Sequence, residues 1–221
     1  MKFPNAYAGV KKIFTSEVLS IIAAICLLVA LILGIVAAGS GANALINESG
    51  SAANATLGSL IGAVVLIAAF GVLTIIAYIL QIVGISKAAK DEPAFKTALI
   101  FVIIGAACAV AYAFTKNNSD AAIVASISST LQRVSNLGVS VYIIQGIRNL
   151  ADRLNNGAIS AKGGTIFKLI LVFYGIIIIA NIVAIFSVTI AAILGIVSAV
   201  LDLIVYIIFI GLLSNAKKML A

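Results

Sequence analysis

Long apolar runs, separated by shorter polar segments, dominate the chain from residue 18 to its end. Each run holds roughly 20 or more predominantly apolar residues, the length that crosses the hydrocarbon core of a bilayer as an α-helix. Transmembrane β-strands would be about half as long and would alternate apolar and polar positions. The pattern therefore predicts an all-α, polytopic membrane protein with six transmembrane helices, over about residues 18–38, 57–85, 95–114, 121–147, 166–186 and 189–213.

The polar segments group these six spans into three predicted hairpins within one transmembrane bundle over residues 18–214. Residues 39–56 are rich in Gly, Ser, Ala and Asn, a composition that predicts a flexible polar loop. Two polar connectors follow, one around Pro93 and a longer one over 148–166 that contains a predicted break at Asn155-Asn156-Gly157. The predicted hairpins cover about residues 18–86, 95–147 and 166–214.

The two ends of the chain are predicted to lie outside the bundle. Within residues 1–17, Phe3, Tyr7, Val10 and Phe14 recur at helical spacing, which predicts an amphipathic helix in the headgroup region. Residues 215–221 contain two lysines and are predicted as a short basic cytoplasmic tail.

Composition supports a membrane location and excludes several other classes. Of the 221 residues, 63% are hydrophobic and only 10% are charged, so a soluble globule could not cover the apolar surface. The net charge of +7 is dispersed at the ends of apolar runs, without the basic, aromatic-interleaved patch that binds nucleic acid. Because Lys and Arg cluster at the two chain ends and the two connectors, we expect both termini in the cytoplasm, for a plasma or inner membrane protein.

A repeated pattern marks the ends of the spans that return to this basic side. Tyr78, Tyr142 and Tyr206 follow one another at steps of 64 residues, each five residues after a leucine and just before an isoleucine. At the start of the outgoing spans, the Phe95-Lys96 pair matches Phe167-Lys168 at an offset of 72. These matches predict three tandem pseudo-repeated hairpins related by an axis along the membrane normal.

Small residues recur at four-residue spacing in several spans, a pattern that lets helix backbones approach closely in lipid. We expect such ridges to serve packing within the bundle, contacts with a second copy, or contacts with another membrane protein. They comprise Ala30, Gly34 and Ala38; Gly58 and Gly62; Gly105, Ala109 and Ala113; and Ala191, Gly195 and Ala199.

The fourth span carries a polar stripe along one helical face, formed by Ser126, Ser129, Thr130, Arg133, Asn136 and Ser140. A charged side chain at the bilayer centre is unfavourable by about 2.5–3.5 kcal/mol, so such residues face an interior or a functional path. Asp202 is the one acid within a predicted span, and an Arg133–Asp202 pair is one hypothesis. The stripe could instead fix helix register, line a path for a small anion or polar solute, or let Arg133 extend toward Asp120.

Catalytic groups are scarce in this sequence. There is no histidine, and neither a paired acid set, a serine nucleophile motif nor a phosphate loop occurs. Cys26 and Cys108 have no CxxC partner, so no metal or cofactor is expected. We therefore expect a non-enzymatic protein that organises or assembles membrane components, or an accessory subunit; a small channel or transporter that uses the fourth span is the alternative.

Overall fold

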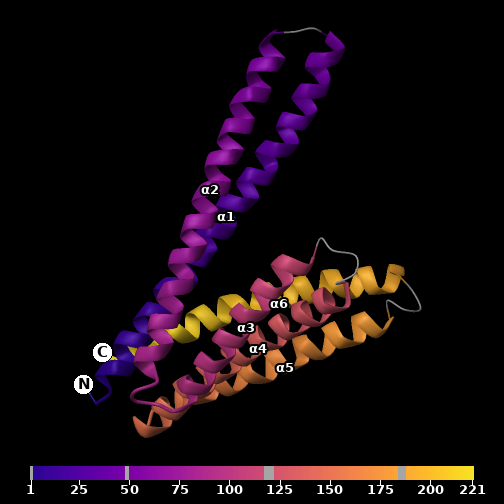
Figure 1. The fold of residues 1–221 in the computed structure, drawn as a ribbon. Coiled ribbons are helices and arrows are strands. Elements are labelled where there is room, and N and C mark those ends of the chain that lie inside the picture. Colours follow the sequence, from indigo (N-terminus) through magenta and orange to yellow (C-terminus); the bar gives the residue numbers. More distant parts are fainter. Residues whose placement is uncertain (1, 48–49, 117–121, 184–187) are drawn as a thin grey trace. The chain divides into compact units, whose positions relative to one another are not determined.

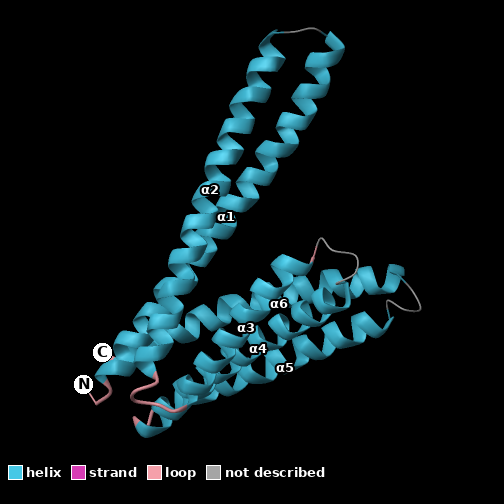
Figure 2. Ribbon diagram, viewed as in Figure 1, coloured by secondary structure: helices cyan, strands magenta, loops and turns pink. Residues whose placement is uncertain are grey.

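The computed structural model describes residues 2–47, 50–116, 122–183 and 188–221 of the chain. Inside its helices, the side chains of residues 40–55, 177–196 and some single positions, among them Ser126, Ala199 and Asp202, lie outside this description. All regular elements in the described ranges are α-helices (Figures 1 and 2). They are α1 (Pro4–Asn47), α2 (Gly50–Ala88), α3 (Ala94–Thr115), α4 (Ala122–Arg153), α5 (Gly157–Val183) and α6 (Val188–Leu220).

Several helices extend well beyond the predicted spans. The prediction of a flexible loop over 39–56 is wrong for its described part, because α1 continues to Asn47 and α2 begins at Gly50. This stretch contains no proline and several alanines, so nothing in it stops a helix strongly. Similarly, α4 runs to Arg153 and α5 begins at Gly157, which leaves only a short turn of the connector predicted over 148–166.

Five of the described helices are long and apolar enough to cross a membrane. These stretches are Pro4–Gly39, Thr56–Ala88, Ala94–Thr115, Gly157–Ile176 and Leu203–Leu220. They indicate an integral membrane protein with contact to a lipid bilayer. Within the ranges described, α4 does not meet this standard, because Gln132, Arg133 and Asn136 interrupt its apolar sequence.

The chain forms two compact units. Unit 1 comprises residues 1–14 and 82–221, and unit 2 comprises residues 15–81. In unit 1, α4 is central and contacts α3, α5 and α6 (Figure 1).

The hydrophobic core of unit 1 lies near the helix ends that the short connectors join. Its largest fully buried side chains include Phe95 at the start of α3, Ile147 and Leu150 near the end of α4, and Leu212 and Leu213 near the end of α6. The buried positions of α3 stop at Gly105, whereas Ile103, Ile104, Val110 and Phe114 are exposed. The large buried side chains of unit 1 therefore gather at one end of its helices.

The two ends of the chain are packed parts of unit 1. Ala6, Val10 and Ile13 of α1 are fully buried, and Gly9 lies so close to α2 that an added Cβ would be 2.5 Å from the carbonyl oxygen of Gly84. The last residues continue α6 to Leu220, which is also buried. Lys217 lies over the ring of Phe14, with its Nζ 4.5 Å from the ring centroid. The membrane position predicted for residues 1–17 stays a prediction.

Unit 2 is an antiparallel pair formed by parts of α1 and α2. Its buried positions on α1 are Glu17 and four small residues at seven-residue spacing: Ser16, Ala23, Ala30 and Ala37. Ala63 and Ala77 are buried on α2, and the Ser16 hydroxyl donates a hydrogen bond of 2.8 Å to the carbonyl oxygen of Ala77. A seven-residue period keeps such a seam on one face when two helices coil around each other with a left-handed twist.

Candidate functional site

The polar stripe predicted on α4 does not face the core of unit 1. Thr130, Arg133 and Asn136 are exposed, and Ser129 and Ser140 are half-buried. Ser126 and Asp202 have side chains outside the described part, so the Arg133–Asp202 pair stays a prediction. With the residues that the structure describes, Arg133 forms neither a hydrogen bond nor an ion pair.

A second polar face of α4 is buried, and the sequence analysis missed it. Ser128 and Ser135 lie one heptad apart and are both buried. A Cβ added to Gly105 of α3 would lie 3.2 Å from the Cβ of Ser135, so this face packs against α3. The seven-residue spacing of the two serines places them on one helical face and could have predicted this contact. The prediction from the sequence was based instead on the longer polar stripe around Arg133.

The predicted ridge at Ala30, Gly34 and Ala38 lines an open apolar groove of unit 2. The groove has a volume of about 470 Å³, and Leu60, Ala63 and Val64 form its α2 side. Ala30 is buried, whereas Ala38 is exposed and a Cβ added to Gly34 would meet no atom within 4 Å. The groove is therefore open above Gly34.

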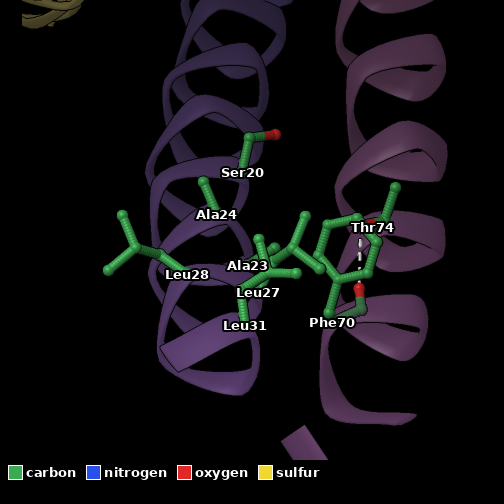
Figure 3. A pocket seen from close by; sticks show the side chains of 8 residues that line it. All are labelled: Ser20, Ala23, Ala24, Leu27, Leu28, Leu31, Phe70 and Thr74. Atoms are coloured by element: carbon green, nitrogen blue, oxygen red, sulfur yellow. Dashed lines mark hydrogen bonds between the residues drawn. The ribbon is translucent and has the colours of Figure 1, made fainter. Parts of the chain in front are cut away.

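A second hollow lies beside this groove, nearer the start of unit 2. It has a volume of about 360 Å³ and is lined by Ala23, Leu27 and Phe70, among others. Figure 3 shows the ring of Phe70 directed from α2 toward α1, and Leu28 directed away from α2. The Thr74 hydroxyl is satisfied within α2 by the carbonyl oxygen of Phe70 at 2.8 Å, so it adds no unpaired polar group to the hollow.

The other predicted ridges occupy varied environments. Gly62 lies against Leu33, whose Cδ1 would be 3.2 Å from an added Cβ, whereas Gly58 is exposed with no such neighbour. On α3, Gly105 is buried, Ala109 half-buried and Ala113 exposed. The side chains at Ala191, Gly195 and Ala199 fall outside the described part, and the packing roles of all these residues stay predictions.

The repeat tyrosines of unit 1 lie beside phenylalanines of the preceding helix. Tyr142 of α4 stacks on Phe101 of α3, with ring centroids 5.6 Å apart. Tyr206 of α6 and Phe173 of α5 line one small cavity of about 80 Å³. Tyr78 belongs to unit 2 and is exposed. The three-hairpin pseudo-repeat stays a prediction.

The turn between α2 and α3 carries two acids that tie other helices to it, an arrangement not anticipated from the sequence. Asp91 accepts hydrogen bonds from the backbone N–H of Ala6 at 2.7 Å and from the side chain of Asn5 at 2.9 Å. These donors lie in the first turn of α1, where the helix dipole and unpaired N–H groups favour a carboxylate. Asp91 therefore caps the N-terminus of α1, which begins at Pro4, 87 residues before Asp91 in the chain.

The second acid, Glu92, is buried and joins the end of α4. Its Oε1 accepts a hydrogen bond of 2.8 Å from Asn149, and its Oε2 lies 2.9 Å from the Nη2 of Arg153. The Glu92 side chain is 3% exposed and that of Arg153 is 49% exposed. Oε2 accepts no well-aligned hydrogen bond within the described residues, so Arg153 stabilises this carboxylate through charge rather than hydrogen-bond geometry.

A polar cavity of about 330 Å³ lies next to this network, between α4 and α5. It is lined by Gln145, Arg148, Asn149 and Asp152 of α4 and by Phe167 of α5. The aliphatic part of the Arg148 side chain packs against α5 at Gly163. A Cβ added to Gly163 would lie 2.5 Å from the Cγ of Arg148. Among the described residues, the buried Nε of Arg148 has no hydrogen-bond partner.

The described part of the chain offers no cluster of three or more potential metal ligands. Cys26 and Cys108 are half-buried free thiols. No family model, curated protein or solved structure matches this chain.

Proposed function

We propose that this integral membrane protein is non-enzymatic and assembles with other membrane helices, from a second copy of the chain or a partner subunit. The observation that carries the proposal is the exposed position of Arg133 on α4, without a partner among the described residues. Arg133 lies 11 residues after the start of α4, about 16 Å along the helix axis at 1.5 Å per residue. That depth is close to the centre of a bilayer about 30 Å thick.

This face of α4 cannot remain in contact with lipid tails. A guanidinium near the bilayer centre is unfavourable by about 2.5–3.5 kcal/mol even on insertion scales. Thr130 and Asn136 add polar groups to the same face. Protein or water must therefore cover it, and contact with another subunit provides that cover.

The groove above Gly34 provides a second contact surface, of the kind that close helix packing uses. In lipid, helices associate through close van der Waals contact at small residues rather than through the hydrophobic effect. A groove with small residues on its floor and leucines and valines on its sides matches a transmembrane helix better than a polar ligand.

For the topology, we propose six spans in three tandem hairpins, with both termini in the cytoplasm and α4 as a polar fourth span. The distribution of Lys and Arg supports this orientation. Single cysteines at Asn5 and Asn47, in a background without Cys26 and Cys108, should react with an impermeant maleimide on opposite sides of intact cells. Labelling of both from the same side would contradict the proposed topology.

The experiment that tests assembly replaces Arg133 with leucine. If another subunit covers this face, Arg133→Leu should shift the protein to a smaller species in mild detergent, measured by size-exclusion chromatography with light scattering. If the face contacts lipid, the same change should stabilise a monomer and leave the size unchanged. Val134→Leu, on the adjacent exposed position, is the matched control without a charge change.

Two further variants separate the surfaces. Gly34→Leu fills the groove and should also reduce the assembled fraction if a helix occupies it. The double variant Arg133→Leu with Asp202→Leu tests an internal pair, because breaking a buried pair leaves one charge uncompensated. If the double change restores the wild-type behaviour that Arg133→Leu loses, Arg133 pairs within the chain, and the proposed interface on α4 is wrong.

A channel or transporter is the second candidate, because an open polar face on α4 would line a water-filled path if subunits surround it. Single cysteines at Thr130, Asn136 and Ser140 would then react with small hydrophilic thiol reagents in the assembled protein. Uniform protection of all three positions would identify a dry interface and would reject transport along α4.

A further inference from the structure

The cavity beside Arg148 contains two opposite charges that do not meet. Arg148 and Asp152 are four residues apart on α4, a spacing at which such side chains commonly pair. Within the described residues they form no ion pair. The reason is that the Arg148 side chain crosses toward α5, where its Cζ would be 3.8 Å from a Cβ added to Gly164. The cavity lies where both charged groups and their amide neighbours converge.

The groups around the cavity have unused hydrogen-bonding capacity. The Nε of Arg148 is buried without a partner among the described residues, and the Arg148 side chain lines the cavity. The amide of Gln145 also forms no hydrogen bond with the described part of the chain. An arginine fork suits a phosphate, because it donates parallel hydrogen bonds to two oxygens.

The carboxylate of Asp152 makes a simple anion a poor ligand for this cavity. A ligand with both a phosphate and a primary ammonium would satisfy both ends, since the ammonium donates to Asp152 while the phosphate accepts from Arg148. The ring of Phe167 provides an apolar wall for the carbon atoms between the charges. The volume of about 330 Å³ corresponds to about ten molecules of liquid water at ~30 Å³ each, enough for a small headgroup.

The cavity lies at the level of a membrane boundary. Phe95, in the first turn of α3, fits against Gly146, where an added Cβ would be 2.6 Å from the ring. Residues 145–152 of α4 are thus level with the start of an apolar helix that begins at Ala94. Lipid headgroups occupy this level of the bilayer.

From this geometry we infer that the cavity binds the phosphoethanolamine headgroup of a membrane lipid, with Arg148 holding the phosphate and Asp152 the ammonium. This site is independent of the proposed assembly surfaces on α1, α2 and α4. Phosphatidylcholine should bind less well, because its trimethylammonium cannot donate hydrogen bonds to Asp152. Phosphatidylglycerol should also bind less well, because it lacks the cation.

The test uses the full-length protein, delipidated in mild detergent and offered one of three lipids with identical acyl chains. Native mass spectrometry then measures retained phosphatidylethanolamine, phosphatidylcholine or phosphatidylglycerol. We expect phosphatidylethanolamine to be retained about tenfold more strongly than phosphatidylcholine or phosphatidylglycerol, because each of these two lipids loses the charge-assisted hydrogen bond to Asp152. Equal retention of all three, or stronger retention of phosphatidylglycerol, would overturn the inference.

Variants link the preference to individual groups. Arg148→Gln should abolish the preference for phosphatidylethanolamine. Asp152→Asn should reduce the discrimination against phosphatidylglycerol, while Arg148 still binds the phosphate. Lys168→Gln, an exposed basic residue next to Phe167 that does not line the cavity, is the control for loss of charge. Since Asp152 is exposed, its variant keeps the test valid if Arg148→Gln misfolds. Unchanged discrimination in Asp152→Asn would reject the proposed orientation.

A competition arm separates a lipid from a soluble ligand with the same headgroup. Soluble glycerophosphoethanolamine should fail to displace the lipid at equal concentration, because it lacks the acyl chains that anchor the headgroup at the boundary. Equal displacement would show that the cavity takes a soluble phosphoethanolamine compound, and the lipid assignment would be wrong.

Discussion

Unit 1 and unit 2 are both built mainly from apolar helices but are held together by different residues. Unit 1 buries large side chains such as Phe95, Ile147 and Leu212, with an acidic turn beside them. Unit 2 buries mainly alanines, and many of its leucines and isoleucines are exposed. Burial of large apolar side chains is favoured where the solvent is water, whereas close contact at small residues is how helices associate in lipid, and the two units follow these two patterns.

The largest expected effect comes from the core of unit 1. Phe95→Ala should lower the free energy of unfolding by about 3–5 kcal/mol, because the buried ring leaves a cavity against Gly146. The measurement is the unfolding midpoint in mixed detergent micelles, followed by far-UV circular dichroism. Phe114→Ala, at an exposed position of the same helix, should have little effect. Equal losses in both variants would contradict the assignment of the core to the connector end.

The Glu92–Arg153 pair should have the next largest effect. Arg153→Leu should cost about 2 kcal/mol, less than a fully buried pair would, because its guanidinium is half exposed to water. Combining it with Glu92→Leu should be tolerated better than either change alone, since no buried charge is then left uncompensated. The same unfolding assay measures all three variants, and strictly additive losses would mean that the two side chains do not interact.

The smallest expected effect lies in unit 2, at the hydrogen bond that the Ser16 hydroxyl donates to the carbonyl oxygen of Ala77. Ser16→Ala should weaken the α1–α2 pairing by about 0.6 kcal/mol, typical of interhelical hydrogen bonds in membranes. Amide hydrogen exchange in α1 near residue 16 should accelerate about threefold. Ser20→Ala is the matched control, because the Ser20 hydroxyl bonds only to the carbonyl oxygen of Ser16 in its own helix. A similar acceleration in both variants would remove the special role of Ser16.

The candidate sites were predictable only in part. The residues of the α4 stripe and the ridge at Gly34 were identifiable because polarity and residue size repeat at helical spacing. The exposure of these residues could not be predicted, since a periodic pattern shows which residues share a helical face but not which other helix packs against that face. The Asp91–Glu92 turn was recognised only as a polar connector, because its partners Asn5 and Asn149 lie 86 and 57 residues away in the chain.

The connector between α4 and α5 was also predictable only in part. Asn155-Asn156-Gly157 predicted a break, and the chain turns there with Asn155 at a φ of 56°, a left-handed conformation that asparagine tolerates. Gly163 and Gly164 were read as part of the same polar segment. They lie inside α5, and Gly163 provides the space that the Arg148 stem occupies.

Local composition is enough to predict that this chain is helical and suited to a bilayer, because apolar run length and the cost of unpaired backbone groups in lipid are local properties. The packing of the helices was needed to see which face of α4 is buried, that Asp91 caps α1 and Glu92 binds Arg153, and why Arg148 and Asp152 remain apart. Those outcomes depend on contacts between distant residues, where a glycine, a ring or a carboxylate on one helix fixes the position of a side chain on another.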